Sequence, residues 1–164
     1  MKNYFKIAIS FLLISATGCS KLDQKLPGSL TGPEVNSALG SAGVQILLNG
    51  AYADLGSTFT AQDLLFCLQE NASDEALVPT RGGDWDDNGV WRVLHNHTWN
   101  ADHQYVLNVF NSLNKLNFDA TNVLAFGPNA TQAAQAKFLR AIALYNLLDL
   151  YGQFPAREPG EDVR

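Results

Sequence analysis

A run of apolar side chains at helical spacing near the end of the chain constrains the fold more than any other feature. These positions lie three or four residues apart and comprise Ala133, Ala136, Leu139, Ala143, Leu147 and Leu150. Thr131 offers an N-terminal cap, and Gly152 and Pro155 favour an end just after the stripe. Because small side chains on the stripe allow close approach of a second helix, the segment is predicted to be a packed α-helix.

Two further segments show weaker helical periodicity. Residues 34–55 follow Pro33, which suits a first helical turn, and Gly56 favours an end. Residues 102–116 carry a second stripe, and this helix can resume through 120–125 before Gly127 and Pro128. The Gly-Pro turn predicts an antiparallel pair with the last helix, the unit that helical solenoids stack. The predicted fold class is all-α, with a solenoid permitted but no repeat period visible.

The stretch from Gly56 to Ala101 has little periodicity and is predicted to be an irregular insertion between the first two helices. It holds all three tryptophans and two of the three histidines. Connections of this length inside a compact domain usually carry function. Candidate site residues are therefore sought mainly here.

The first 19 residues have the pattern of an export signal. Lys2 and Lys6 precede a short apolar run, which ends in small residues before Cys19. The run of about ten residues is too short to cross a membrane, which takes roughly 20. A cysteine at this point resembles the lipobox of bacterial lipoproteins, which implies lipid attachment at Cys19; the alternative is an ordinary secretory signal. The predicted organisation is a signal peptide at 1–18, a lipid anchor and tether at 19–33, and a helical domain at 34–164.

Cysteine content and charge narrow the classes of function. Once Cys19 is lipidated, Cys67 has no internal disulfide partner, and its apolar neighbours favour a buried small side chain. Two of the 11 basic residues lie in the leader, so nine remain against 16 acidic ones. Nucleic acid is an unsuitable partner for such an acidic chain, which has no basic stripe. No motif for a phosphate, a dinucleotide, another cofactor or a nucleophilic serine is present.

Three histidines raise the question of a metal site. His95 and His97 form an HxH pair, and His103 follows. The hydrolase pattern that begins with HxH continues with Asp and His four and five residues after the first histidine, whereas here Asp102 and His103 come seven and eight later. Ordinary hydrogen bonding is the favoured interpretation, and a histidine-ligated metal hydrolase is the alternative.

Alternating acidic residues resemble half of a calcium loop. Asp84, Asp86 and Asn88 occupy alternate positions and Gly89 is the sixth residue, as in an EF-hand. The twelfth position holds His95 instead of a bidentate glutamate. An acidic turn is therefore favoured over a calcium site.

The irregular stretch also has the composition of a carbohydrate site. Aromatic faces stack on sugar rings, and planar polar groups hydrogen-bond to their hydroxyls. The candidates are Arg81, Asp84, Trp85, Trp91, Trp99, Asn100 and Asp102. Trp91 lies among Val90, Val93 and Leu94, so it is predicted to be core packing instead.

Taken together, these segments resemble the N-terminal part of the SusD/RagB family of outer-membrane lipoproteins. The resemblance rests on the Cys19 leader and three runs. They are QENASDE at 69–75 with RGGDW at 81–85, WR at 91–92 leading to HTW at 97–99, and AKFLRA at 136–141 continuing to LYG at 150–152.

The resemblance implies a helical, tetratricopeptide-like binding protein that is not an enzyme. It would lie on the exterior face of the outer membrane and pass oligosaccharides or other nutrients to a TonB-dependent, SusC-like transporter. Family members are about three times as long, so the resemblance also implies a truncated chain.

The family's binding loop maps most closely onto Trp99, Asn100 and Asp102, with Asp84 and Trp85 second. Its implied roles are stacking for the tryptophans and hydrogen bonding for the others. Arg140 is expected to form a structural pair. The alternative function is a helical interaction module without its own ligand site.

Overall fold

The computed structural model describes residues 32–79, 83, 87–154 and 158–159, and these residues form helices and no strands. The predicted all-α class is therefore confirmed. The predicted signal peptide, Cys19 and most of the tether lie outside the described residues. No described helix combines the length and apolarity needed to span a membrane.

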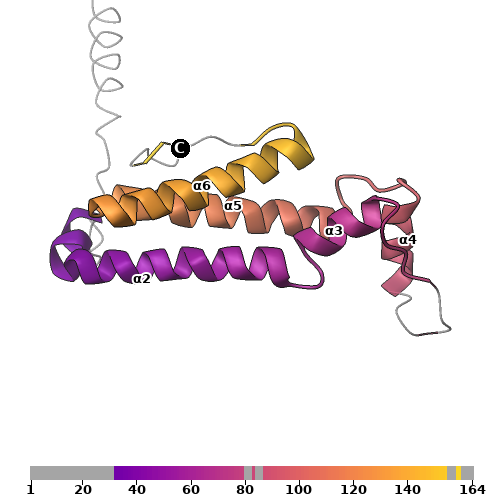
Figure 1. Ribbon diagram of the computed structural model, residues 1–164, viewed down its shortest axis with the longest axis horizontal. Coiled ribbons are helices and arrows are strands. Elements are labelled where there is room, and N and C mark those ends of the chain that lie inside the picture. Colours follow the sequence, from indigo (N-terminus) through magenta and orange to yellow (C-terminus); the bar gives the residue numbers. More distant parts are fainter. Residues whose placement is uncertain (1–31, 80–82, 84–86, 155–157, 160–164) are drawn as a thin grey trace, which may run out of the picture. The chain divides into compact units, whose positions relative to one another are not determined.

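Three long helices lie against one another (Figure 1): α2 (Gly32–Thr60), α5 (Gln104–Ala125) and α6 (Ala130–Tyr151). Helices α5 and α6 are joined by residues 126–129, where Gly127 adopts a positive φ of 66°. This short connection returns the chain alongside α5. The predicted helical pair is confirmed.

Helix α2 extends beyond its predicted end. Gly56 does not stop it, and the helix continues to Thr60. The irregularity lies instead at Gly40, whose φ of 52° and ψ of −153° interrupt the helical geometry. Glycine tolerates this conformation because it has no Cβ, so a kink at Gly40 causes less steric strain than it would at any other residue type.

Helix α5 differs from its prediction at both ends. It begins at Gln104 instead of 102, and it runs without a break to Ala125. The polar residues after Leu116 do not end it, because the buried stripe continues through Ala120 and Val123. Burial of one face thus outweighs the weak local signal.

The ends of α6 are defined by its caps. The Asn129 side chain accepts a hydrogen bond from the Gln132 N–H at 2.9 Å, and the Gln132 side chain accepts one from the Asn129 N–H at 3.1 Å. This capping box replaces the predicted Thr131 cap. Gly152, with φ of 70°, forms the predicted C-terminal cap.

The main core lies among α2, α5 and α6, which together are called the helix trio. Its buried side chains come at spacings of three and four residues and are Val44, Leu48, Ala51, Leu116, Ala120, Val123, Ala136, Leu139 and Ala143. Alanines on α6 keep the helices close. The predicted packing role of the small-residue stripe is confirmed.

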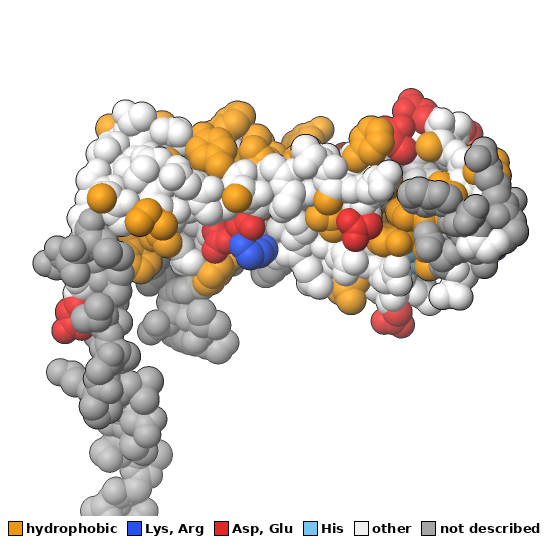
Figure 2. All heavy atoms as spheres, turned by 90° about the horizontal axis from the view of Figure 1, so that it is seen from below, with side chains coloured by type: hydrophobic (Ala, Val, Ile, Leu, Met, Phe, Trp, Pro, Cys, Tyr) orange, Lys and Arg blue, Asp and Glu red, His pale blue; other side chains and the backbone are white. Residues whose placement is uncertain are grey.

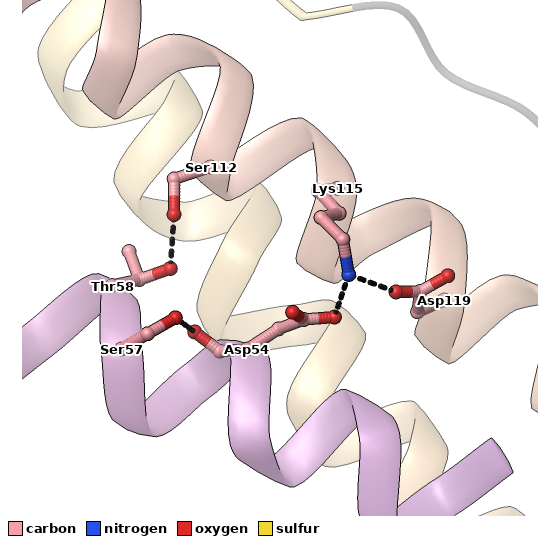
Figure 3. Close-up of polar contacts among 6 residues, drawn as sticks. All are labelled: Asp54, Ser57, Thr58, Ser112, Lys115 and Asp119. Atoms are coloured by element: carbon pink, nitrogen blue, oxygen red, sulfur yellow. Dashed lines mark hydrogen bonds and ion pairs between the residues drawn. The ribbon is translucent and has the colours of Figure 1, made fainter.

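Polar groups also join α2 to α5 (Figure 3). The hydroxyls of Thr58 and Ser112 hydrogen-bond to each other, and Thr58 is fully buried. The Lys115 ammonium lies 2.5 Å from an Asp54 oxygen and 2.7 Å from an Asp119 oxygen. Hydrogen bonds to Asp119 and Asp54 raise the pKa of Lys115. These contacts fix how the two helices pair along their length.

The predicted irregular stretch contains short helices. They are α3 (Leu65–Ala72), the 3₁₀ turn η1 (Asp87–Gly89) and α4 (Val90–His95). Leu65, Leu68 and Leu94 are buried, and they form a second core with the beginning of α5 and the end of α6. The described residues of 61–103 are called the short-helix region below. The prediction of an irregular insertion therefore does not hold at these short helices.

Candidate functional site

The loop that follows α4 carries three of the predicted ligand-binding residues and is fixed by two histidines. His97 Nε2 lies 2.8 Å from the Ala72 carbonyl oxygen at the end of α3. His103 Nε2 lies 3.1 Å from the Val90 carbonyl oxygen at the start of α4. Each ring therefore connects the loop to a neighbouring short helix.

The three predicted residues lie close together on this loop. The Trp99 ring packs edge-on against His97, with 5.3 Å between centroids and 73° between planes, and Trp99 stays 39% exposed. Asn100 Oδ1 accepts a hydrogen bond from the Asp102 backbone N–H at 3.0 Å, which fixes a turn. The side chains of Asn100 and Asp102 are exposed. An indole, an amide and a carboxylate are thus presented to solvent.

An open pocket of about 560 Å³ begins at the same loop and is called the terminal pocket. Ala101 forms part of its wall. The remaining lining residues come from the start of α5, the last residue of α6 and the segment just after it: Val106, Leu107, Phe110, Tyr151, Gln153 and Phe154. The wall is mostly apolar and contains three aromatic rings. Such a pocket suits a ligand with apolar faces.

Tyr151 holds the two helices together at this pocket. Its hydroxyl donates a hydrogen bond to the Val106 carbonyl oxygen at 2.7 Å, and its ring meets Phe110 edge-on. Burial raises the pKa of Tyr151 to about 12. The phenol is therefore a neutral hydrogen-bond donor near pH 7.

The histidine pattern does not form a metal site among the described residues. No group of three potential ligands lies together in that part of the chain. His97 and His103 direct one ring nitrogen each toward backbone carbonyls, as favoured from the sequence.

The other predicted residues have different outcomes. Trp91 is 6% exposed and stacks on Tyr105 at 4.3 Å, so its core assignment is confirmed. Arg140 lies 3.7 Å from Glu158, in agreement with a pairing role. Cys67 was expected to be a buried small side chain; it is half-buried and forms no disulfide. Asp84 and Trp85, together with Arg81 of the carbohydrate candidates and Asp86 of the calcium-like loop, lie outside the described residues.

The sequence interpretation missed the walls of the terminal pocket. Phe110 and Tyr151 are 41 positions apart, and only the pairing of α5 with α6 brings them together. An antiparallel pair places the start of one helix beside the end of the next. The predicted pairing of the two helices was therefore sufficient to expect Phe110 near Tyr151.

Comparisons of the chain with protein-family models, with curated proteins and with solved structures find no match. The family resemblance of the sequence therefore stays a prediction.

Proposed function

We propose that this protein is a lipid-anchored, SusD-like binding protein at the cell exterior. It captures oligosaccharides or related nutrients and delivers them to a TonB-dependent, SusC-like transporter in the outer membrane. In this proposal Cys19 carries the lipid, and Trp99, Asn100 and Asp102 contact the ligand. Asp84 and Trp85 are additional contacts. The protein itself performs no chemical step.

The observation that carries the proposal is the exposed, fixed position of Trp99 on the loop whose Ala101 lines the terminal pocket. Ring stacking is effective when the aromatic face is held in place before the ligand arrives. His97 and the turn at Asn100 hold the loop that carries Trp99. The Asn100 amide can donate hydrogen bonds to sugar hydroxyls and accept them, and the Asp102 carboxylate can accept them.

The test is calorimetric titration of the full chain with a panel of malto-, xylo-, manno- and mucin-derived oligosaccharides. At least one is expected to bind, and Trp99→Ala is expected to weaken it about tenfold through lost stacking. Tyr145→Ala is the matched control, because it removes an aromatic ring that is 68% exposed on α6 and does not line the terminal pocket. Equal loss in both variants, or none in Trp99→Ala, would reject this site.

A specific observation supports a second candidate, a helical interaction module without its own ligand. Helix α6 exposes Phe138, Tyr145 and Leu148, which are 60%, 68% and 55% exposed. Apolar side chains also reach the surface at several places on the face drawn in Figure 2. Exposed apolar groups on one helix are typical of protein contacts.

The two candidates separate in a co-purification experiment with the proposed transporter. A double variant, Phe138→Ser with Tyr145→Ser, is expected to abolish co-purification only when α6 is the docking face. Trp99→Ala is its control, because Trp99 lies outside α6. Transporter association without affinity for any oligosaccharide of the panel favours the interaction module.

A further inference from the structure

A second pocket, of about 340 Å³, lies in the short-helix region and is called the acidic pocket. Its lining includes two carboxylates, Asp63 and Glu70, the amide of Asn71, and the aromatic rings of Phe66, Trp91 and Tyr105. It shares no lining residue with the terminal pocket. None of its described lining residues is Lys, Arg or His.

Asn71 leaves an acceptor unsatisfied at this pocket. The residue is 4% exposed, and its Nδ2 donates a hydrogen bond to the Cys67 carbonyl oxygen at 2.9 Å. With Nδ2 used in this bond, the oxygen of the same amide, Oδ1, is buried and has no hydrogen-bond partner. A buried acceptor without a partner is costly, so a ligand that brings an N–H or O–H donor gains from it.

The charges of the pocket favour a positive donor over a neutral one. Partial burial and the neighbouring Glu75 carboxyl raise the pKa of Glu70. Burial, Asp63 and Glu70 likewise raise the pKa of the Cys67 thiol, which stays neutral. Two carboxylates and no positively charged side chain line the pocket, so a cation balances charge that a neutral hydroxyl leaves unbalanced.

The aromatic side chains that line the pocket favour an organic cation over a metal ion as its ligand. Trp91 and Tyr105 stack with 4.3 Å between centroids and 17° between planes, and both rings are largely buried. Phe66 is 59% exposed. Aromatic faces attract ammonium groups and pack against apolar stems. A metal ion instead needs several converging ligands, and no group of three occurs among the described residues.

From these features we infer that the acidic pocket binds a primary ammonium group on an apolar stem. The ammonium donates hydrogen bonds to Asn71 Oδ1 and to the carboxylates of Asp63 and Glu70. The stem lies against Trp91 and Phe66. This binding is separate from the proposed oligosaccharide site at Trp99 and does not rest on it.

The experiment is calorimetry of the full chain with 2-phenylethylammonium chloride. The neutral probe 2-phenylethanol has nearly the same shape and lacks the charge. The ammonium is expected to bind about tenfold or more tightly than the alcohol, and raising the salt concentration is expected to weaken it. Equal affinity for both probes, or no binding of the ammonium compounds, would overturn the inference.

Variants locate the binding within the chain. Glu70→Gln keeps the shape of the side chain and is expected to weaken ammonium binding about fivefold. Asp149→Asn is the matched control, because it removes one exposed carboxylate of α6 outside the pocket. If Glu70→Gln does not fold, Asp63→Asn is measured in its place, and the same loss of ammonium affinity is expected. Equal affinities in the pocket variants and Asp149→Asn would also overturn the inference.

Two further measurements define the source of the ammonium and its independence from the sugar site. Nα-acetyl-lysine methylamide represents a lysine side chain of a peptide, whereas 2-phenylethylammonium represents a free amine. The probe that binds more tightly shows whether the ammonium group comes from a peptide lysine or from a free amine. Trp99→Ala is expected to leave ammonium affinity unchanged. A loss in that variant equal to the loss in Glu70→Gln would place the binding elsewhere and reject the acidic pocket.

Discussion

The helix trio and the short-helix region are built in different ways from the same chain. In the trio, three long helices supply a regular buried stripe, and a capping box begins α6. In the short-helix region, α3 and α4 have eight and six residues and no side-chain cap at either N-terminus. Short helices are not stable alone in water, so packing against α5 and α6 must hold them.

The two regions differ less in their buried polar atoms than in their pockets. Buried side-chain atoms without hydrogen-bond partners occur at Asn71 Oδ1, His95 Nδ1 and His103 Nδ1 in the short-helix region, and Asn117 Oδ1 is another on α5 of the trio. The acidic pocket lies in the short-helix region, and the terminal pocket begins at its last loop. Both pockets thus border the short-helix region, while α5 and the end of α6 supply most of the wall of the terminal pocket.

The largest expected effect is in the trio. Leu139→Ala removes a fully buried side chain from the middle of α6. Its neighbours Ala136 and Ala143 are too small to fill the cavity, so the free energy of unfolding is expected to fall by about 3 kcal/mol. Urea unfolding followed by circular dichroism measures the change. Leu148→Ala, at an exposed site of the same helix, is the control and should change it by less than about 0.5 kcal/mol.

The matching substitution in the short-helix region tests whether the two regions open separately. Leu94 is also fully buried, but its neighbours belong to the second core. Leu94→Ala is expected to lower the free energy of local opening in α3 and α4 by about 2 kcal/mol, with little change in α6. Hydrogen exchange with mass spectrometry resolves the two regions.

The control for this experiment is Leu77→Ala, because Leu77 is 57% exposed in the same region. It should leave exchange in α3 and α4 unchanged. Equal acceleration of exchange in α6 and in α3 by Leu94→Ala would mean that the regions unfold as one unit.

The sequence predicts the trio better than the short-helix region for a physical reason. Helix α6 is marked by a long stripe, and its predicted start and end lie close to the observed ones. Helix α3 has only eight residues, too few to show a clear period, and its burial depends on contacts with distant segments. The continuation of α5 past Leu116 likewise depends on burial of Ala120 and Val123 by other helices.

The candidate site follows the same rule. Trp99, Asn100 and Asp102 are close in sequence, so a local pattern could place them together, and they do lie on one turn. The acidic pocket joins Asp63 to Trp91 and Tyr105, which no local pattern connects. Its one usable signal was the polar run at 69–71 directly after an apolar segment.

Alkaline pH is expected to loosen the junction of α5 and α6 near the terminal pocket. Burial raises the pKa of Tyr151 from its ordinary value of 10.0 to about 12 in the folded chain. The unfolded chain therefore loses this proton first, and stability falls as pH rises from about 10 to 12. The full shift corresponds to about 2.7 kcal/mol, and solvent screening at this half-buried ring reduces the expected loss to about 1.5 kcal/mol.

Tyr151→Phe isolates this contribution, because it removes the titrating hydroxyl and keeps the ring. Denaturant unfolding of both proteins at pH 9 and pH 12 gives the difference in stability at each pH. The advantage of the wild type is expected to shrink as pH rises. A constant difference would show that folding does not raise the pKa of this hydroxyl.

The smallest effect concerns how α6 begins. Asn129→Ala removes the side-chain acceptor of the Gln132 N–H and breaks the capping box, so the free energy of unfolding is expected to fall by about 1 kcal/mol. Thr131→Ala is the matched control, because Thr131 is exposed and only its backbone carbonyl accepts the Gln135 hydrogen bond. A larger loss of stability in Thr131→Ala than in Asn129→Ala would instead support Thr131 as the cap, as the sequence predicts. A loss confined to Asn129→Ala would show that a local side-chain cap stabilises the start of α6, a contribution that α3 and α4 lack.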